Sequence, residues 1–154
     1  MSVSLLDILS PESVRVPLKG TTKRAVIDEL CELVSGCEGV SDLEQLRATV
    51  WEREDQRSTG IGEGLAIPHG KCTSVTQPTM AIGRPIEPLE FGSIDGKPVH
   101  LVVLLASPAD RIAEHIQALG KISRVMTDSD VRERAYSAET PEELYQLFAE
   151  HVTS

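Results

Sequence analysis

Hydrophobic and polar positions along this chain switch between the period of a strand and the period of a helix. Polar and apolar residues alternate over residues 13–18, and residues 79–83 read TMAIG, so a short strand is predicted at each place. Residues 99–106 read VHLVVLLA, a nearly continuous apolar run that predicts a central strand covered on both faces. Residues 5–9 are expected to form a short helical turn that stops before Pro11.

Apolar residues at helical spacing predict two helices in the first third of the chain. The first is expected to be capped by Thr21 or Thr22 and to end at Gly36. The second is expected to open with a capping box of Ser41 and Glu44 and to run to about residue 54. Its predicted buried stripe consists of Leu43, Leu46 and Val50.

Three more helices are predicted in the last third of the chain, over residues 110–128, over 129–137 and from residue 140 onward. The last is expected to open with Thr140 as cap, Pro141 as first residue and Glu143 as capping-box acid. The apolar stripes predicted for the first and the last of these helices are Ile112, Ile116, Leu119, Ile122 and Met126, and Leu144, Leu147, Phe148 and Val152.

Strands that alternate with helices, without a repeat or a long linker, predict one α/β domain over residues 1–154. We expect a mixed β-sheet flanked by helices on both faces. Hydrophobic residues make up 40% of the chain and aromatic residues only 3%, so the core is expected to be mainly aliphatic.

Charge and cysteine content exclude several classes of protein. A formal net charge of -9 argues against nucleic-acid binding through a broad basic surface and against anionic membranes. Three cysteines, at 31, 37 and 72, are an odd number without regular spacing, which argues against a disulfide framework and a four-cysteine zinc site. Neither a secretory signal nor an apolar stretch of membrane-spanning length is present, so the protein is expected to be cytoplasmic.

The most unusual segment of the chain is REDQRSTGIGEGLAIPHGK, residues 53–71. Exposed amides and hydroxyls in such a segment can cradle an anion, whereas its glycines alone can equally serve a tight turn. The candidate phosphoryl-binding loop comprises Ser58, Thr59, Gly60, Gly62 and Gly64.

His69 follows the apolar run LAI and a proline, and it precedes Gly70. Proline fixes the backbone before the imidazole and glycine leaves space after it, which suits a nucleophile that is attacked in line. The residues alone leave open that His69 merely caps a strand end. His100, at a predicted strand start, and His151, near the C-terminus, are interpreted as structural or exposed.

The order of residues around His69 resembles the phosphorylation signature of phosphotransferase-system IIA domains of the fructose/mannitol class. The resemblance rests on Glu54, on residues 61–62 (IG) and on residues 65–70 (LAIPHG), and it extends through FGSIDGKPVHLVVLLASPADRIAEHIQAL. The resemblance covers nearly the whole chain. Within this class, the chain most resembles the stand-alone nitrogen-regulatory IIA type.

The resemblance implies a role for four residues. His69 corresponds to the phosphorylated histidine, and His115 to a second, helix-borne histidine that contacts the phosphoryl group. Arg53 corresponds to an arginine that stabilises charge, and Glu63 to a loop acid that orients His115 or Arg53. The residues alone also permit a solvated helix-end arginine, a core histidine and a plain loop acid.

The resemblance implies a phosphotransferase component that accepts a phosphoryl group from a histidine phosphocarrier protein. Regulation related to nitrogen or potassium, through targets such as transporters or sensor kinases, is expected rather than sugar transport. No cofactor and no metal are expected. One alternative is an unphosphorylated regulatory binding module of the same fold. Another is a zinc hydrolase that uses His69, His115 and Glu63, although no HExxH or HxH spacing supports it.

Overall fold

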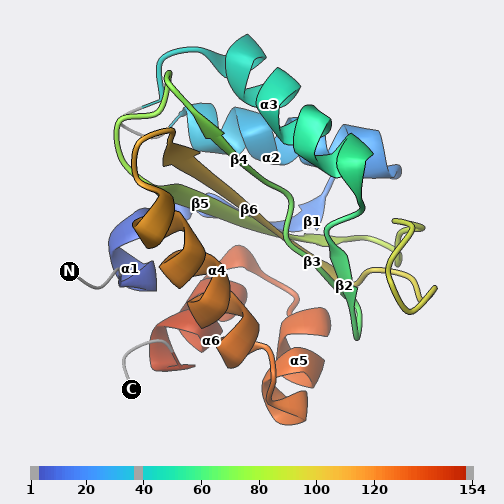
Figure 1. Cartoon of the computed structure of the whole chain (residues 1–154). Coiled ribbons are helices and arrows are strands. Elements are labelled where there is room, and N and C mark those ends of the chain that lie inside the picture. Colours follow the sequence, from blue (N-terminus) through green and yellow to red (C-terminus); the bar gives the residue numbers. More distant parts are fainter. Residues whose placement is uncertain (1–3, 37–39, 152–154) are drawn as a thin grey trace.

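The computed structural model of the chain describes residues 4–36 and 40–151. These residues form a six-stranded mixed sheet with helices on both faces, as predicted (Figure 1). In chain order the elements are α1 (Leu5–Ile8), β1 (Leu9–Leu18), α2 (Lys23–Ser35), α3 (Leu43–Gln56), β2 (Gly60–Gly62), β3 (Leu65–Ala66), β4 (His69–Cys72), β5 (Thr79–Pro85), β6 (Leu101–Pro108), α4 (Ile112–Val125), α5 (Ser129–Tyr136) and α6 (Pro141–His151). None of the helices in the described ranges has the length and apolar character needed to cross a membrane.

Strand β6 is the central strand of the sheet. The order is β1-β5-β6-β3-β2, and β4 also pairs with β6. Strand β6 runs antiparallel to β5 and parallel to both β3 and β4, while the edge strand β1 runs parallel to β5. All eight residues of β6 are buried, which confirms the predicted central strand. It begins at Leu101 rather than at residue 99, because Val99 forms an isolated bridge with Leu89.

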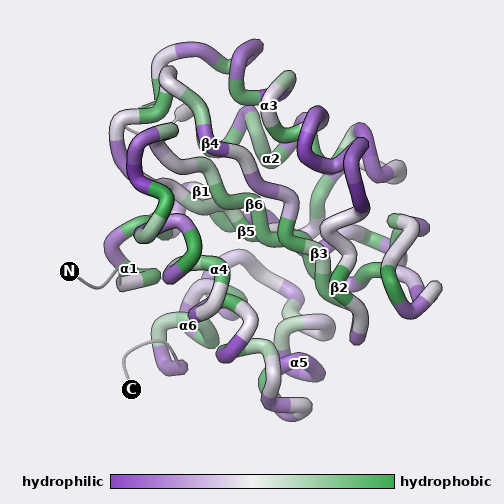
Figure 2. Tube along the Cα trace, in the orientation of Figure 1, coloured by the Kyte–Doolittle hydropathy of each residue, from purple (hydrophilic) through white to green (hydrophobic). Residues whose placement is uncertain are grey.

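The side chains of β6 alternate between two hydrophobic cores. Leu101, Val103 and Leu105 pack in a core formed with α1, α4, α5 and α6. Val102 and Leu104 pack in a second core formed with α2 and α3. Figure 1 shows these helix groups on opposite faces of the sheet, and Figure 2 shows hydrophobic positions concentrated in the strands between them.

Two of the three predicted helix caps are confirmed, and one is wrong. The Thr22 hydroxyl accepts a hydrogen bond from the Ala25 N–H, and the Thr140 hydroxyl accepts one from the Glu143 N–H. The cap of α3 is Asp42, whose carboxylate accepts from the Gln45 N–H. Ser41 instead donates its hydroxyl to the Ser74 carbonyl. The expected glutamate of that box binds an arginine on the helix surface instead of closing the box.

The predicted apolar stripe of α4 is partly wrong. Ile112 and Ile116 are 52% and 62% exposed, whereas Ile122 is fully buried. The helix turns a different face toward the sheet, because His115 and Ala118 lie on the buried side with Ile122. The stripes of α3 and α6 are confirmed at Leu46, Val50, Leu144, Leu147 and Phe148; Leu43 is only partly buried, and Val152 lies outside the described residues.

The segment predicted as a loop contains three short strands, β2, β3 and β4. Each has only two to four residues, so none shows a period that the sequence reveals. Their hydrogen-bonding partners are far away in the chain, because β3 and β4 pair with β6. Cys31 and Cys72 are buried with free thiols, and Cys37 lies outside the described residues.

Candidate functional site

His69 is the first residue of β4 and is partly exposed. Strands β3 and β4 keep the same register along β6, with Ala66 opposite Val102 and His69 opposite Leu105. The Leu105 N–H donates to the Pro68 carbonyl at 3.0 Å, so the interruption at proline does not release the chain from the sheet. The position of the imidazole is therefore set by strand pairing.

Gly70 allows helix α3 to pack closely against β4. A Cβ atom at this position would lie 3.0 Å from a side-chain carbon of Thr49 and 3.2 Å from one of Val50. Because neighbouring residues of a strand face opposite sides, His69 faces away from α3 and toward the side of α4.

The His69 ring is held by a backbone carbonyl two residues earlier in the chain. Its Nδ1 lies 2.8 Å from the Ile67 carbonyl oxygen. A carbonyl can only accept, so the neutral ring carries its proton on Nδ1 and has its lone pair on Nε2. Burial lowers the pKa of His69, the bond to Ile67 opposes that shift, and the Arg53 charge adds to it. The ring is therefore neutral near pH 7, with a nucleophilic Nε2.

His115 of α4 lies beside His69. The two ring centroids are 5.2 Å apart with a tilt of 57°. His115 is 3% exposed, and its Nδ1 lies 2.7 Å from the Ser107 hydroxyl. Its Nε2 is a buried polar atom without a partner among the described residues. Burial, with smaller contributions from His69 and Lys71, lowers the pKa of His115 to about 4, so this ring is also neutral at pH 7.

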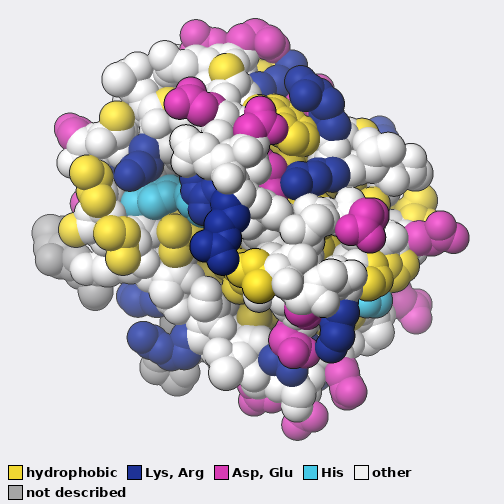
Figure 3. Space-filling model, turned by 45° about the vertical axis from the view of Figure 1, so that its right-hand side comes forward, with side chains coloured by type: hydrophobic (Ala, Val, Ile, Leu, Met, Phe, Trp, Pro, Cys, Tyr) yellow, Lys and Arg dark blue, Asp and Glu magenta, His cyan; other side chains and the backbone are white. Residues whose placement is uncertain are grey.

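A hollow of about 340 Å³ adjoins His69. It combines two arginines with an apolar wall, and its lining residues are Arg53, Arg57, Ser58, Thr59, Ile61, Ile67, His69, Ile94, Leu119 and Ser123. Arg53 is on the last turn of α3, and its Nη1 donates to the Arg57 carbonyl at 2.8 Å. Figure 3 shows lysine and arginine side chains next to a histidine on this side of the molecule, with hydrophobic side chains nearby.

The structure does not bring Glu63 to this hollow. Glu63 is in the turn between β2 and β3 with a φ of 56°. Its N–H donates to Asp95, and its carbonyl accepts from the Tyr136 hydroxyl. Within the described ranges its carboxylate has no hydrogen bond to Arg53 or His115, so the orienting role implied by the resemblance has no geometric support.

The glycines of the predicted phosphoryl-binding loop belong to the same hairpin. Gly62 and Gly64 have φ values of 105° and 83°, the left-handed backbone that a tight turn needs. Gly60 lies against Ser93, where a Cβ would fall 2.3 Å from the hydroxyl oxygen. None of the three lines the hollow, so they serve turn geometry and close packing there.

Ser58 and Thr59 do line the hollow, but their hydroxyls have partners within the protein. Ser58 donates to the Phe91 carbonyl and Thr59 donates to the Glu54 carboxylate. Neither hydroxyl is free to serve as an anion donor in this arrangement.

Two residues of the site, Glu54 and Ser107, were given no role from the sequence. Glu54 is 4% exposed at the end of α3 and accepts hydrogen bonds from Thr59. A signal for it was present, because Leu46, Val50 and Glu54 follow one another at a spacing of four residues and share the buried helix face. Ser107 sits at the end of the apolar run, and nothing in the sequence pairs it with His115.

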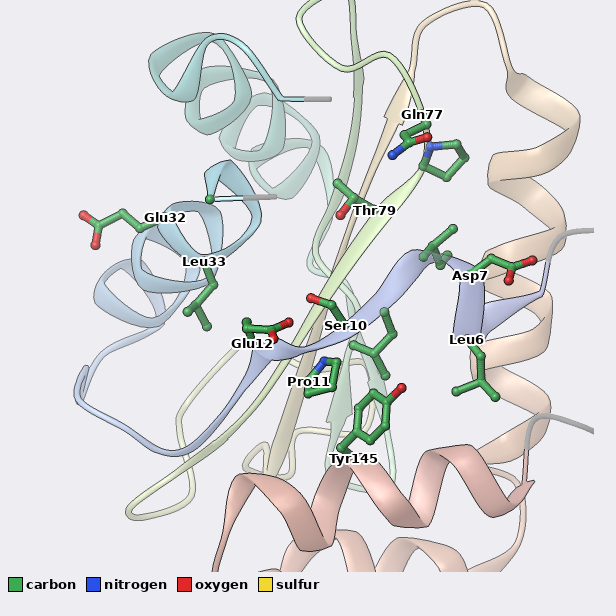
Figure 4. Close-up of a pocket in the computed structure, with 14 residues that line it drawn as sticks. Leu6, Asp7, Ser10, Pro11, Glu12, Glu32, Leu33, Gln77, Thr79 and Tyr145 are labelled. Carbon is green, nitrogen blue, oxygen red and sulfur yellow. The ribbon is translucent and has the colours of Figure 1, made fainter. Parts of the chain in front are cut away.

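Two observations bear on other kinds of site. Among the described residues, no group of three or more His, Cys, Asp or Glu side chains could hold a metal ion, and the zinc alternative therefore gains no support. A larger hollow of about 770 Å³ lies beside the edge strand β1 (Figure 4). The described residues that line it include Ser10, Glu12, Thr79 and Tyr145 but no histidine, lysine or arginine.

The arrangement of sheet and helices matches solved IIA proteins. The nitrogen regulatory protein IIA-Ntr of Neisseria meningitidis superposes with a TM-score of 0.85 at 30% sequence identity, covering 92% of this chain and 97% of that one. The chain thus has the IIA fold of the fructose/mannitol class.

A family model described as phosphoenolpyruvate-dependent sugar phosphotransferase system, EIIA 2, matches residues 7–151. The chain belongs to this family. A fructose-specific EIIA component of Haloferax volcanii is 32% identical over 153 residues, covering 99% of each chain. A nitrogen regulatory protein of Pseudomonas aeruginosa is 33% identical over 145 residues, covering 94% of each. The chain spans 24% of the fructose-specific EIIABC component of Bacillus subtilis, to which it is 30% identical.

Proposed function

We propose that this IIA domain accepts a phosphoryl group on Nε2 of His69 from a histidine phosphocarrier protein. The observation that carries the proposal is the hydrogen bond from Nδ1 to the Ile67 carbonyl, which leaves Nε2 as the nitrogen with a lone pair. His69 also borders the hollow lined by Arg53, and its ring lies beside that of His115.

The transfer exchanges one nitrogen–phosphorus bond for another. The lone pair of His69 Nε2 attacks the phosphorus atom as the bond to the donor histidine breaks, and the electron pair of that bond returns to the donor nitrogen. When the second nitrogen of the donor ring carries a proton, the donor leaves as neutral imidazole. The His69 Nδ1 proton stays in place, and the Ile67 carbonyl stabilises the positive charge that the phosphorylated ring gains.

Arg53 and His115 are the residues proposed to stabilise the transferred group. Phosphoryl transfer depends mainly on positioning and on stabilisation of the oxygens. The planar fork of Arg53 suits two phosphoryl oxygens at once. When His115 Nδ1 accepts a hydrogen bond from the Ser107 hydroxyl, the proton of the neutral ring is on Nε2. The unpartnered Nε2 can then donate to a third oxygen.

We propose a regulatory use of the phosphorylated state rather than sugar transport. The support is the likeness over nearly the whole chain to nitrogen regulatory proteins, although sugar-specific relatives match as well. A phosphoryl group adds about -1.5 to -2 charge at His69, which is enough to change how target proteins such as transporters or sensor kinases dock there.

Intact-mass measurement after incubation with phosphorylated histidine phosphocarrier protein tests this proposal. We expect a gain of one phosphoryl group in the wild type and in His100→Ala, and no gain in His69→Ala. NMR of the product is expected to show phosphorus on Nε2. An unchanged mass of the wild type with a donor that phosphorylates another IIA domain would favour the unphosphorylated binding module.

A further inference from the structure

A line of hydrogen bonds connects His69 to the ion pair of Glu54 and Lys23, whose carboxylate lies on the last turn of helix α3. The His69 Nδ1 donates to the Ile67 carbonyl, and the Ile67 N–H donates to the Thr59 carbonyl at 3.0 Å. The Thr59 N–H and hydroxyl in turn donate to the two oxygens of Glu54, at 3.0 and 2.6 Å. Lys23 binds the same carboxylate from helix α2 at 2.8 Å.

Glu54 is built into the protein as a charged acceptor. Its side chain is 1% exposed, and it receives three donors, two from Thr59 and one from Lys23. A carboxylate can accept all three at once, whereas a buried carboxylate without such partners would be strongly unfavourable. The arrangement therefore fixes a negative charge at the junction between α3 and β2.

Each link of the line holds the next residue in place. The hydrogen bonds to Glu54 hold the N–H and the side chain of Thr59, and the carbonyl of the same residue accepts from the Ile67 N–H. Ile67, held through its N–H, then presents its carbonyl to the imidazole. The N–H and the carbonyl of one residue belong to different peptide groups, so the effect passes from Glu54 to the imidazole through the positions of Thr59 and Ile67. Glu54 also acts on the His69 ring by a direct charge interaction.

We propose that Glu54 is a positioning residue for His69, and that with Lys23 and Thr59 it keeps the imidazole in the Nδ1-protonated form whose Nε2 is the nucleophile. Glu54 does this through the positions of Thr59 and Ile67, without touching the transferred group. The link to phosphoryl transfer rests on the function proposed above, but the effect on the ring exists in the unphosphorylated protein.

The test is Glu54→Gln, with Glu29→Gln as matched control. Glu29 is also a buried helix carboxylate that accepts two backbone N–H groups and pairs with an arginine, Arg15, but it contacts no part of the hollow. Glu54→Gln removes the negative charge and one acceptor oxygen, so all three contacts survive only if the Thr59 hydroxyl reverses and accepts from the new NH₂ group. The ring nitrogens of His69 are observed by ¹⁵N NMR at a pH where the ring is neutral.

We expect the wild type and Glu29→Gln to show the Nδ1-protonated form almost alone, and Glu54→Gln to show a mixture of both forms. With phosphorylated donor, kcat of Glu54→Gln should fall by about tenfold to a hundredfold while KM changes little, because a misplaced nucleophile slows the transfer itself. Glu29→Gln should share the loss of thermal stability but keep kcat.

Unchanged ring nitrogens in a folded Glu54→Gln would overturn the proposal, whether or not His69 proves to be phosphorylated. If Glu54→Gln does not fold, Thr59→Val serves the same test, since it removes the hydroxyl donor and keeps the shape of the side chain. If the ring shifts as expected but no variant takes up phosphate, the proposed function fails and the positioning role of Glu54 stands.

Discussion

At the scale of single residues, the candidate site depends on two histidines in different surroundings. His69 is partly exposed and hydrogen-bonded to the Ile67 carbonyl, while His115 is buried and hydrogen-bonded to the Ser107 hydroxyl. The resemblance to IIA domains implied that both histidines belong to the site. It did not predict their partners, because the Ile67 carbonyl and the Ser107 hydroxyl come into reach only through strand pairing and helix packing.

The buried His115 should make stability depend on pH. Its pKa falls from 6.5 in the unfolded chain to about 4 in the folded one, so the unfolded state binds more protons between these values. The folded state is thus fully favoured above pH 6.5 and loses about 3 kcal/mol on acidification to pH 4. Urea unfolding as a function of pH measures this loss.

The control for this prediction is His115→Asn, which keeps a polar partner for Ser107 but cannot take up a proton. The difference in free energy of unfolding between wild type and variant should shrink as the pH falls from 6.5 to 4. Lowered carboxylate pKa values, as at Glu29, also reduce stability in acid, but they are common to both proteins and cancel. A difference that stays constant with pH would contradict a depressed pKa of His115.

At the scale of secondary-structure elements, the segment before His69 is the main departure from what the sequence predicts. Helices with long apolar stripes and the continuous run of β6 were predicted because a pattern of eight or more residues identifies them. Strands β2, β3 and β4 are too short for a pattern, and β6 supplies the pairing that makes the latter two strands. Of the glycines that suggested an anion cradle, Gly62 and Gly64 shape the turn between β2 and β3, and Gly60 packs against Ser93.

Substitution of Gly64 tests that interpretation of the turn. Its φ is 83°, and a Cβ would lie 2.9 Å from both His100 and Tyr136. Gly64→Ala should lower the free energy of unfolding by about 1 to 3 kcal/mol, through backbone strain and these contacts. Chemical denaturation measures the change.

Gly120→Ala provides the matched comparison within helix α4. Nothing lies within 4 Å of a Cβ at this position, and alanine favours a helix over glycine by about 1 kcal/mol. The same substitution should therefore stabilise the protein here. Equal effects at the two glycines would show that the turn does not need its left-handed backbone.

At the scale of the whole molecule, an acidic protein presents a local group of cations at its candidate site. The net charge is -9, yet Arg53 and Arg57 both line the hollow, and Lys71 is close enough to affect both histidines. Glu54, the buried acid next to them, is already paired with Lys23. The electrostatic potential at the hollow is thus set by the nearby charged side chains and cannot be inferred from the net charge of the protein.

Charge reversal at Arg57 should weaken transfer from a phosphorylated donor. The hollow would lose a cation that attracts the incoming phosphoryl group, so kcat/KM should fall by about tenfold at low salt and less at high salt. Stopped-flow transfer rates at several salt concentrations measure this. Arg134→Glu on α5 changes the net charge by the same amount away from the hollow, and it should leave kcat/KM nearly unchanged. Equal losses in both variants would mean that total charge controls the encounter.

The overall architecture was more predictable than the site. Strand-like and helix-like segments alternate along the chain, and this was enough to predict helices on both faces of a mixed sheet. A strand such as β6, whose two faces are both buried, must be covered by helices on each side. The site needed spatial information. Glu63 is six residues before His69 in the chain but turns away with its hairpin, whereas Glu54, fifteen residues before it, is connected to the ring through Thr59.

Strand β6 provides a common frame of reference for the two histidines. His69 pairs opposite Leu105, and His115 is bonded to Ser107 two residues further along the same strand and on the same face. A slip of β4 by one residue would turn the His69 ring to the opposite face, toward α3, and separate it from His115. The distance between the two rings thus depends on the register of β4 at His69 and on the packing of α4 against β6 at His115.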